Sequence, residues 1–256
     1  MDFKGKRVLV TGSTRGIGRC AAEMFHQAGA SVAINGRDAG KVTEVIRELG
    51  GDRLVAAPGD VSTIEGCQSA VDTAVHQLGG LDCLVNNVGT WSTAGILDVT
   101  EAEWDRVMNT NVRSALFCSK AAAPALREST GSIVLVSSIA ALTPGPSTTF
   151  LYSVAKAGLI GMMRALTVEL AADNVRVNCV CPGFVDTPGV GRHINMEDDV
   201  LRDGAAQLVP LGRLGTLREC ASAILYFASD DANFCAGSIL SNDGGCAVRV
   251  GWTARS

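Results

Sequence analysis

The sequence has few charged and few aromatic residues, and no segment of it is strongly basic. Charged residues make up 19% of the 256 residues, aromatic residues 5%, and the formal net charge is −4. Proteins that bind nucleic acids or anionic lipid surfaces carry clustered positive charge, so we expect neither partner. Disorder is excluded as well, because 47% of the residues are apolar and such a chain can bury a large core.

The positions of the cysteines and histidines in the sequence indicate neither a disulfide framework nor a metal site. The nine cysteines are odd in number and scattered along the chain, whereas a disulfide framework uses an even number at characteristic spacings. Cys179 and Cys181 are separated by one residue, but no second pair or histidine cluster accompanies them, so no metal is expected. Reduced thiols of this kind are typical of a cytoplasmic protein, which is the location we expect.

The distribution of charged and apolar residues predicts neither a secretory signal nor a membrane span. Residues 1–7 are rich in charge and lead into only three apolar residues, too few for the apolar part of a signal sequence. The longest uncharged stretch, residues 129–155, contains Pro144 and Pro146 among Ser and Thr residues. A helix exposed to lipid would not tolerate that composition, so we expect no membrane association.

Short apolar runs alternate with helical periodicity from one end of the chain to the other. Most of the runs are continuously apolar, as in strands that are buried on both faces of a parallel sheet. Helical periodicity covers residues 100–126 and 152–170, among others. We therefore predict one domain over residues 1–256, a Rossmann-like, doubly wound α/β fold with helices on both faces of a seven-stranded parallel sheet. The predicted strands span residues 7–10, 31–35, 53–57, 83–86, 132–137, 176–180 and 238–241.

Three predicted helix starts carry the capping-box pattern, in which Glu follows a Ser or Thr after three residues. Each pair predicts that a helix begins directly after its Ser or Thr. The pairs are Ser62 with Glu65, Thr100 with Glu103, and Thr216 with Glu219.

A glycine-rich loop follows the first predicted strand and leads into a helix. Gly12 permits a tight turn, Gly16 lets the backbone approach a pyrophosphate, and Gly18 lets the helix pack closely on the strand. The free N–H groups and the dipole of the helix N-terminus would hold the anion. The loop therefore predicts a dinucleotide site formed by Gly12, Ser13, Thr14, Arg15, Gly16, Ile17 and Gly18.

The end of the second predicted strand bears on the choice of cofactor. An NAD-preferring site usually has an acidic residue here, but this chain has Gly36 followed by Arg37, with Arg15 in the glycine-rich loop. Two guanidinium groups near a 2′-phosphate favour NADP(H), with NAD(H) as the open alternative. Asp38 lies nearby, and either arginine could instead be a solvated surface charge.

Four further residues suggest acid–base chemistry. Tyr152 and Lys156 are spaced i, i+4, which places them on one helical face about 6 Å apart. At an effective dielectric of about 20, the ammonium would lower the pKa of Tyr152 by ~2 units, toward a value useful for proton transfer. Ser138 ends a strand and could orient a substrate oxygen, whereas Asn111 could hold a water beside Lys156 or simply bond the backbone.

Taken in order, these motifs resemble those of the short-chain dehydrogenase/reductase family, in its compact single-domain branch, and are similar to those of its 3-oxoacyl-carrier-protein reductases. The resemblance covers nearly the whole chain. It rests on Thr11-Gly12-x-x-x-Gly16-Ile17-Gly18, Asp60-Val61, Asn86-Asn87-x-Gly89, Asn111, Ser138, Tyr152-x-x-x-Lys156, Pro182-Gly183, Thr187 and Asp243-Gly244-Gly245.

The resemblance implies hydride transfer between NADP(H) and a carbonyl compound or secondary alcohol. It implies that Tyr152 is the general acid/base, Ser138 orients the substrate oxygen, Lys156 binds the cofactor ribose and tunes Tyr152, and Asn111 holds a proton-relay water. The cofactor contacts that it implies, in addition to the glycine-rich loop, Arg37, Tyr152 and Lys156, are Asp60, Val61, Asn87, Gly89, Pro182, Gly183, Val185 and Thr187.

The chain departs from the family pattern in two places. Val88 stands where Ala is usual, and the stretch from Ser138 to Tyr152 is one residue longer than the common spacing, which leaves Ser137 as a second candidate for the orienting role. The family builds a substrate flap at a position that corresponds to residues 187–212, and His193 there could contact substrate or be a solvent-exposed loop residue.

Other functions fit the sequence less well. A serine hydrolase needs a nucleophile elbow, but residues 145–149, Gly-Pro-Ser-Thr-Thr, lack its closing Gly. A regulatory protein that binds NADP without turnover remains the alternative from another class. The complete set of Asn111, Ser138, Tyr152 and Lys156 argues against it.

The helix predicted at residues 152–170 also indicates that the protein associates with copies of itself. Its residues Leu151, Val154, Gly158, Met162 and Ala165 form a second apolar face. A helix that is apolar nearly all round is buried on both sides. We therefore expect a homo-oligomer, a tetramer or a dimer, and a small-molecule substrate as the other partner.

Overall fold

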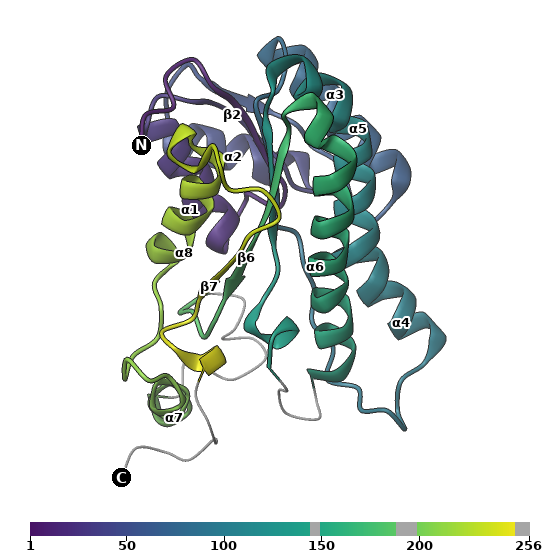
Figure 1. Ribbon diagram of the computed structural model, residues 1–256, viewed down its shortest axis with the longest axis vertical. Coiled ribbons are helices and arrows are strands. Elements are labelled where there is room, and N and C mark those ends of the chain that lie inside the picture. Colours follow the sequence, from purple (N-terminus) through teal and green to yellow (C-terminus); the bar gives the residue numbers. More distant parts are fainter. Residues whose placement is uncertain (144–148, 188–198, 249–256) are drawn as a thin grey trace.

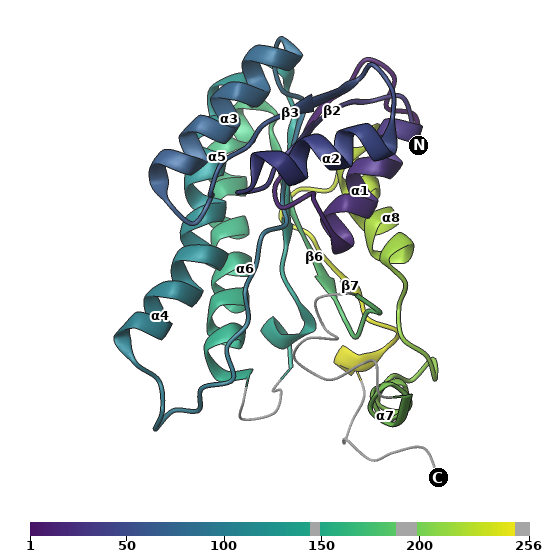
Figure 2. The same ribbon diagram turned by 180° about the vertical axis from the view of Figure 1, so that it is seen from behind.

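The computed structural model describes residues 1–143, 149–187 and 199–248. Its seven strands form one parallel sheet that lies between two layers of helices (Figures 1 and 2). This confirms the predicted fold class. The strands are β1 (Arg7–Val10), β2 (Ser31–Ile34), β3 (Leu54–Ala56), β4 (Cys83–Asn86), β5 (Ser132–Val136), β6 (Arg176–Pro182) and β7 (Ile239–Asn242). The helices are α1 (Gly16–Gln27), α2 (Ala39–Leu49), α3 (Ile64–Leu78), α4 (Glu101–Met108), α5 (Ser114–Ser129), α6 (Phe150–Leu170), α7 (Asp199–Leu208) and α8 (Leu217–Ala228).

The two layers of helices bury two separate apolar cores against the sheet. Helices α3, α5 and α6 cover one face, and α1, α2 and α8 cover the other (Figure 1). Successive residues of a strand face opposite sides, so Leu9 contributes to the first core and Val8 and Val10 to the second. Because each strand is buried on both faces, nearly all its residues are apolar, which is why the strands were detectable in the sequence.

The order of the strands places a crevice between β1 and β4. The sheet runs β3-β2-β1-β4-β5-β6-β7, so the chain leaves β1 toward one side of the sheet and β4 toward the other. Loops that diverge in this way leave a crevice at the carboxyl edge of the sheet, where open α/β proteins bind ligands. The glycine-rich loop after β1 and the Asn87–Gly89 segment after β4 both border this crevice.

The helix predicted at residues 100–126 is interrupted. It consists of α4, a π-helical turn at Asn109–Arg113, and α5. The side-chain amide of Asn111 donates a hydrogen bond of 2.8 Å to the carbonyl oxygen of Val107, the group that would accept the Asn111 backbone N–H in an α-helix. The wide turn makes room for that bond, and such turns are frequent at functional sites.

The structure corrects one predicted helix start and qualifies another. Helix α3 is capped by Thr63, whose hydroxyl accepts from the N–H of Gly66, whereas the hydroxyl of Ser62 donates to Asp60. At α4, Thr100 caps as expected, but the side chain of Glu103 binds Arg106. The complete capping box forms at α8, between Thr216 and Glu219. No helix in the described part of the chain is long and apolar enough to cross a bilayer.

Candidate active site

The structure brings the four residues predicted to be catalytic together at the carboxyl edge of the sheet. The π-helical turn supplies Asn111, the end of β5 supplies Ser138, and α6 supplies Tyr152 and Lys156 one turn apart. The Nζ of Lys156 lies 5.5 Å from the centre of the Tyr152 ring, and Ser138 lies close enough to Tyr152 to lower the pKa of its hydroxyl.

Gly89, after β4, lies between two members of this group. A Cβ atom at position 89 would lie 2.9 Å from Oδ1 of Asn111 and 3.0 Å from Nζ of Lys156. The first contact is shorter than real Cβ atoms make and the second is tighter than most of them, so the absence of a side chain at Gly89 leaves room between the amide and the ammonium.

The pKa of Tyr152 corrects the expectation that the ammonium lowers it. Burial raises this pKa to about 12, and the nearby Ser138 opposes the rise only in part. The expectation treated the phenol as if it were well solvated, whereas in the structure the loss of water around the phenolate outweighs the charge of Lys156. At neutral pH the hydroxyl of Tyr152 therefore keeps its proton in the cofactor-free protein.

Lys156 is a buried ammonium with one fixed partner. The side chain is 3% exposed, and its Nζ donates a hydrogen bond of 3.0 Å to the carbonyl oxygen of Val136. Burial lowers the pKa of Lys156 to about 8, because removal from water disfavours the charged form. The ammonium thus predominates at pH 7 and is lost within the mildly alkaline range.

Asn111 uses its amide to bond the backbone. The side chain is 1% exposed, and its Nδ2 donates to the carbonyl oxygens of Val107 and Thr90, at 2.8 and 2.9 Å. Its Oδ1 accepts a hydrogen bond of 3.3 Å from the N–H of Thr90. The bond to the backbone considered for Asn111 is therefore present, and it fixes the segment that follows Gly89.

The two candidates for the orienting serine differ in their surroundings. The hydroxyl of Ser137 is buried and donates a hydrogen bond of 2.8 Å to the carbonyl oxygen of Lys156. Ser138 is only partly buried, accepts from the N–H of Ala140 at 3.2 Å, and lies close to Tyr152. The geometry favours Ser138, because its hydroxyl lies beside the phenol that would act on the same substrate oxygen.

The glycine-rich loop forms a cradle that an anion could occupy. At Gly12, which has φ +64°, a Cβ would lie 2.8 Å from Cγ2 of Val88, and at Gly18 it would collide with the side chain of Asn87. At Gly16, by contrast, no described atom lies within 4 Å of the Cβ position. No described side chain caps α1, whereas α2, α3, α4 and α8 begin with capped N–H groups. The residues present therefore fit a dinucleotide phosphate at this helix N-terminus.

Two of the predicted cofactor ligands use their side chains to hold the loop in place. The hydroxyl of Ser13 is fully buried, donates to the carbonyl oxygen of Val10 at 2.7 Å and accepts from the N–H of Asn35 at 2.9 Å. The amide of Asn87 donates a hydrogen bond of 3.0 Å to the carbonyl oxygen of Thr11. These two side chains therefore hold the backbone of the cradle in place.

Sequence analysis missed Asn35, which joins three loops at this edge. Its Oδ1 accepts from the N–H of Gly12 at 3.1 Å, and its Nδ2 donates to the carbonyl oxygens of Ala57 and Gly59, at 2.9 and 3.3 Å. The available signal was a polar residue at the end of an apolar strand.

The residues around the end of β2 determine which side chains are available to contact the 2′ position of a cofactor ribose. A Cβ at Gly36 would lie 2.7 Å from Cγ2 of Thr14, so an acidic side chain has no room there. The carboxylate of Asp38 accepts from the N–H of Lys41 and caps α2. Arg15 and Arg37 are both exposed on this side of the cradle.

The remaining predicted ligands lie along the rest of the same edge. Asp60 is exposed and accepts hydrogen bonds from the N–H and hydroxyl of Ser62, and Val61 beside it is buried. After β6, a Cβ at Gly183 would lie 2.7 Å from Cα of Asp243, and Val185 pairs with Gly215 in an isolated bridge. Pro182 is the last residue of β6, and Thr187 is the last residue of the described range 149–187.

The predicted substrate flap is described only in part. Residues 188–198, which include His193, lie outside the described residues, and residues 199–208 of the flap form α7.

A second missed residue, Trp91, lies directly against Tyr152. The centres of the two rings are 4.6 Å apart and their planes are inclined by 37°. The sequence offered a signal, because Trp91 is one of only three tryptophans and follows the Asn-Asn-x-Gly segment.

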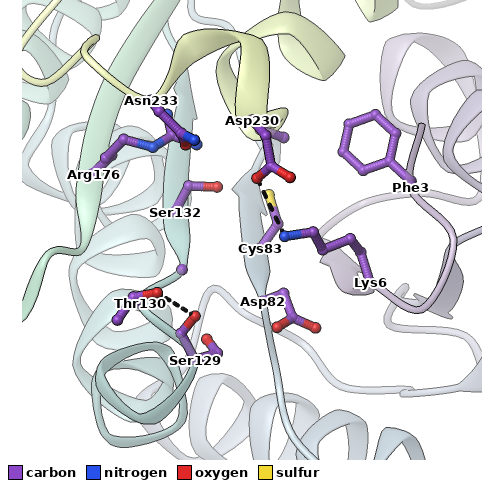
Figure 3. Close-up of a pocket in the computed structure, with 12 residues that line it drawn as sticks. Phe3, Lys6, Asp82, Cys83, Ser129, Thr130, Ser132, Arg176, Asp230 and Asn233 are labelled. Carbon is purple, nitrogen blue, oxygen red and sulfur yellow. Dashed lines mark hydrogen bonds and ion pairs between the residues drawn. The ribbon is translucent and has the colours of Figure 1, made fainter. Parts of the chain in front are cut away.

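A polar cavity of about 150 Å³ lies at the opposite edge of the sheet (Figure 3). It is lined by Cys83, Ser132 and Arg176, the first residues of three neighbouring strands. The guanidinium of Arg176 is fixed there by hydrogen bonds to three carbonyl oxygens, and Lys6 pairs with Asp230 at 3.2 Å. Because parallel strands begin at this edge, the cavity is separate from the site around Tyr152.

Comparisons with known proteins find relatives along nearly the whole chain. A family model described as enoyl-(acyl carrier protein) reductase matches residues 12–247. The 3-oxoacyl-(acyl-carrier-protein) reductase of Chlamydia trachomatis is 37% identical over 246 residues, which cover 94% of this chain and 97% of the relative. The human dehydrogenase/reductase SDR family member 4 is 35% identical over 250 residues, 96% of this chain and 88% of the relative. The solved structure of a candidate short-chain alcohol dehydrogenase from Sinorhizobium meliloti has a TM-score of 0.89 at 35% identity, covering 97% of this chain and 99% of that one.

Proposed function

The chain belongs to the short-chain dehydrogenase/reductase family, and on that premise we propose that it transfers a hydride between NADP(H) and a carbonyl compound or secondary alcohol. The family acts on CH–OH and carbonyl groups, and this chain is an oxidoreductase of that kind. The observation that carries the proposal is the arrangement of Tyr152, Ser138 and Lys156 beside the open cradle at Gly16.

The residues that would hold the cofactor follow the crevice from one end to the other. The N–H groups at the start of α1 would hold the pyrophosphate, Arg15 and Arg37 a 2′-phosphate, and Lys156 the ribose beside the reactive ring. Bound NADP(H) would supply or accept the hydride at the reacting carbon. The Pro182–Thr187 segment would face the nicotinamide side.

In the direction of reduction, Tyr152 acts as the general acid. Its hydroxyl, which keeps its proton at neutral pH because its pKa is raised to about 12, donates that proton to the carbonyl oxygen. The hydroxyl of Ser138 donates a hydrogen bond to the same oxygen and orients it. The phenolate that remains is stabilised by the ammonium of Lys156, 5.5 Å from the ring centre.

The test is turnover measured as the change in NADPH absorbance at 340 nm. A panel of ketones, 3-oxoacyl thioesters, sugars and sterols is assayed with NADPH and with NADH. We expect saturable reduction of at least one class with NADPH. Tight NADPH binding without turnover across the whole panel would instead support the regulatory, binding-only alternative.

The cofactor preference can be tested at the two exposed arginines. Arg15→Ala and Arg37→Ala are each expected to weaken NADPH binding by roughly 10- to 100-fold and to leave NADH binding unchanged, because a charge-assisted bond to the 2′-phosphate is lost. Fluorescence titration with each nucleotide measures the effect, and Arg47→Ala, an exposed arginine in the last turn of α2, is the matched control. Equal weakening of NADH and NADPH binding would rule out a 2′-phosphate contact.

We also propose that the protein is a homo-oligomer, a dimer or a tetramer, that contacts its copies through α6. The structure alters the predicted face in two respects, because Leu151 is fully buried against Val107 and Met162 is partly buried against the first core. The apolar or small residues exposed on α6 are Phe150, Val154, Ala157, Gly158, Gly161, Ala165 and Val168. All nine cysteines are free, which supports the proposed cytoplasmic location.

A negative charge introduced on the exposed face of α6 is expected to dissociate the homo-oligomer into monomers. Val168 is 81% exposed, so Val168→Glu costs little within one chain but would bury a carboxylate in an interface between chains. Analytical ultracentrifugation of the variant is expected to show the monomer where the unaltered protein sediments as a larger species. Leu97→Glu, at a 94% exposed position in the loop before α4, is the control, and an unchanged mass for Val168→Glu would exclude α6 as the contact.

A further inference from the structure

Trp91 is the largest side chain in contact with the proposed general acid. It follows β4 at the carboxyl edge of the sheet, and its ring centre lies 4.6 Å from that of Tyr152. Both side chains are only partly buried, so the pair borders the open part of the site. The indole is therefore a close neighbour of the proposed acid in this part of the site.

An ion pair on α4 holds the backbone on which Trp91 is mounted. The Nη1 of Arg106 donates to the hydroxyl of Thr90 at 2.7 Å, and its Nη2 donates to the carbonyl oxygen of Trp91 at 2.6 Å. Glu103 fixes the guanidinium through two hydrogen bonds of 2.7 Å and also binds the side chain of Ser92. We call the pair Glu103–Arg106 the α4 clasp.

Asn111 holds the same segment from the other side. It bonds both the N–H and the carbonyl oxygen of Thr90, whereas the α4 clasp bonds Thr90, Trp91 and Ser92. Three consecutive residues are therefore tied down. The backbone below the indole cannot shift without breaking several charge-assisted hydrogen bonds, which are roughly twice as strong as neutral ones.

We propose that Trp91 is a specificity-determining residue of this site, and that it selects carbonyl substrates with a flat, unsaturated group on the carbonyl carbon. This rests on the proposed function. The indole presents a rigid wall beside the reactive hydroxyl, against which an aryl or conjugated group can stack. A saturated, puckered group of the same size has no flat face and gains no stacking. Leu142, directly after the 3₁₀ turn that follows Ser138, and Phe150, the first residue of α6, are exposed apolar residues close in sequence to Ser138 and Tyr152.

The test compares two ketones of equal carbon skeleton, methyl phenyl ketone and methyl cyclohexyl ketone. The measured quantity is the ratio of their kcat/KM values with NADPH. In the unaltered protein we expect the flat ketone to be preferred, and Trp91→Ala is expected to lower the ratio by roughly 3- to 10-fold, the range of one aromatic contact. Trp91→Phe is expected to keep most of the preference, because it keeps a ring at the position.

The α4 clasp is tested with a matched pair of arginine variants. Arg106→Gln releases the carbonyl oxygen of Trp91 and is expected to lower the same ratio. Arg127→Gln breaks an ion pair with Asp173 at the far end of α5 and is expected to leave it unchanged. The two arginine side chains are exposed to the same extent, 46% and 47%, so a general loss of surface charge affects both alike.

A readout that needs no turnover separates this proposal from the proposed function. The chain has two tyrosines, so in a Tyr226→Phe background the absorbance of phenolate at 295 nm reports Tyr152 alone. The groups that face Tyr152 are Ser138, Lys156 and Cys181, and none of them is altered. Trp91→Ala uncovers the phenol and is expected to lower its pKa from about 12 toward 10.

The possible outcomes test the proposed function and the specificity role of Trp91 separately. If no ketone is reduced by the unaltered protein but Trp91→Ala shifts the phenol titration, the proposed function fails and the contact between the rings stands. If the two ketones are reduced with a ratio that neither Trp91→Ala nor Trp91→Leu changes, the specificity role is overturned. Far-UV circular dichroism establishes that each variant is folded, and Trp91→Leu serves if Trp91→Ala is not.

Discussion

Tyr152→Phe is expected to lower kcat/KM for carbonyl reduction by roughly 100- to 10,000-fold, the usual contribution of a positioned general acid. The substitution removes a single oxygen atom. The ring itself remains, so its packing against Trp91, with the ring centres 4.6 Å apart, and its place over the ammonium of Lys156 are preserved. The loss therefore falls on proton donation to the carbonyl oxygen, whereas the affinity for NADPH is expected to stay within about twofold.

The chain contains its own control for this experiment. Tyr226, on α8, is the only other tyrosine, it is exposed, and it lies on the opposite layer of helices from Tyr152 (Figure 1). Tyr226→Phe is expected to leave kcat/KM and NADPH binding unchanged. The rate is followed at 340 nm and the affinity by fluorescence titration. If Tyr152→Phe retained a tenth or more of the activity, the assignment of the general acid would be wrong.

The sequence predicted the strands well because their burial is a local property. A strand covered by helices on both faces must be apolar at nearly every position, and such runs are visible in any window. The observed ends of β1 and β4 coincide with the predicted ones, and the others differ by one or two residues. The carboxyl ends of β1 and β4 then had to meet at one edge, which placed the glycine-rich loop beside Gly89.

The remaining features depend on contacts that no local pattern contains. The π-helical turn follows from a side-chain bond of Asn111 to Val107 and Thr90, although the apolar periodicity continues through it. The pKa of Tyr152 was predicted in the wrong direction because its distance from Lys156 could be read from their spacing but its burial could not. Arg106 gave no signal at all, since its partners Thr90 and Trp91 lie about 15 residues away along the chain.

Lys156→Met is the second substitution with a large expected effect. The methionine matches the length and shape of the lysine but removes the ammonium that stabilises the phenolate and that would hold the cofactor ribose. We expect kcat/KM to fall by at least roughly 100-fold, and NADPH binding to weaken as well, in contrast with Tyr152→Phe. An activity within tenfold of the unaltered protein would show that the charge of Lys156 plays no part in proton transfer.

The same variant tests the burial of Lys156 without any catalysis. The pKa of Lys156 is lowered to about 8 in the folded protein, from an ordinary 10.5 in the unfolded chain. Between these two values the unfolded chain binds more protons, so the free energy of unfolding rises with pH in that window, and the gain is lost as the pH falls from 10.5 to 8. Urea unfolding of the cofactor-free proteins is expected to show the unaltered protein gaining about 3 kcal/mol relative to Lys156→Met between pH 7.5 and pH 10.5. The comparison cancels the titration of the groups that lie far from Lys156, which both proteins share. A difference that stayed flat over this range would mean that the ammonium is solvated, and that it does not occupy the buried position beside Val136 from which it could act on the phenol.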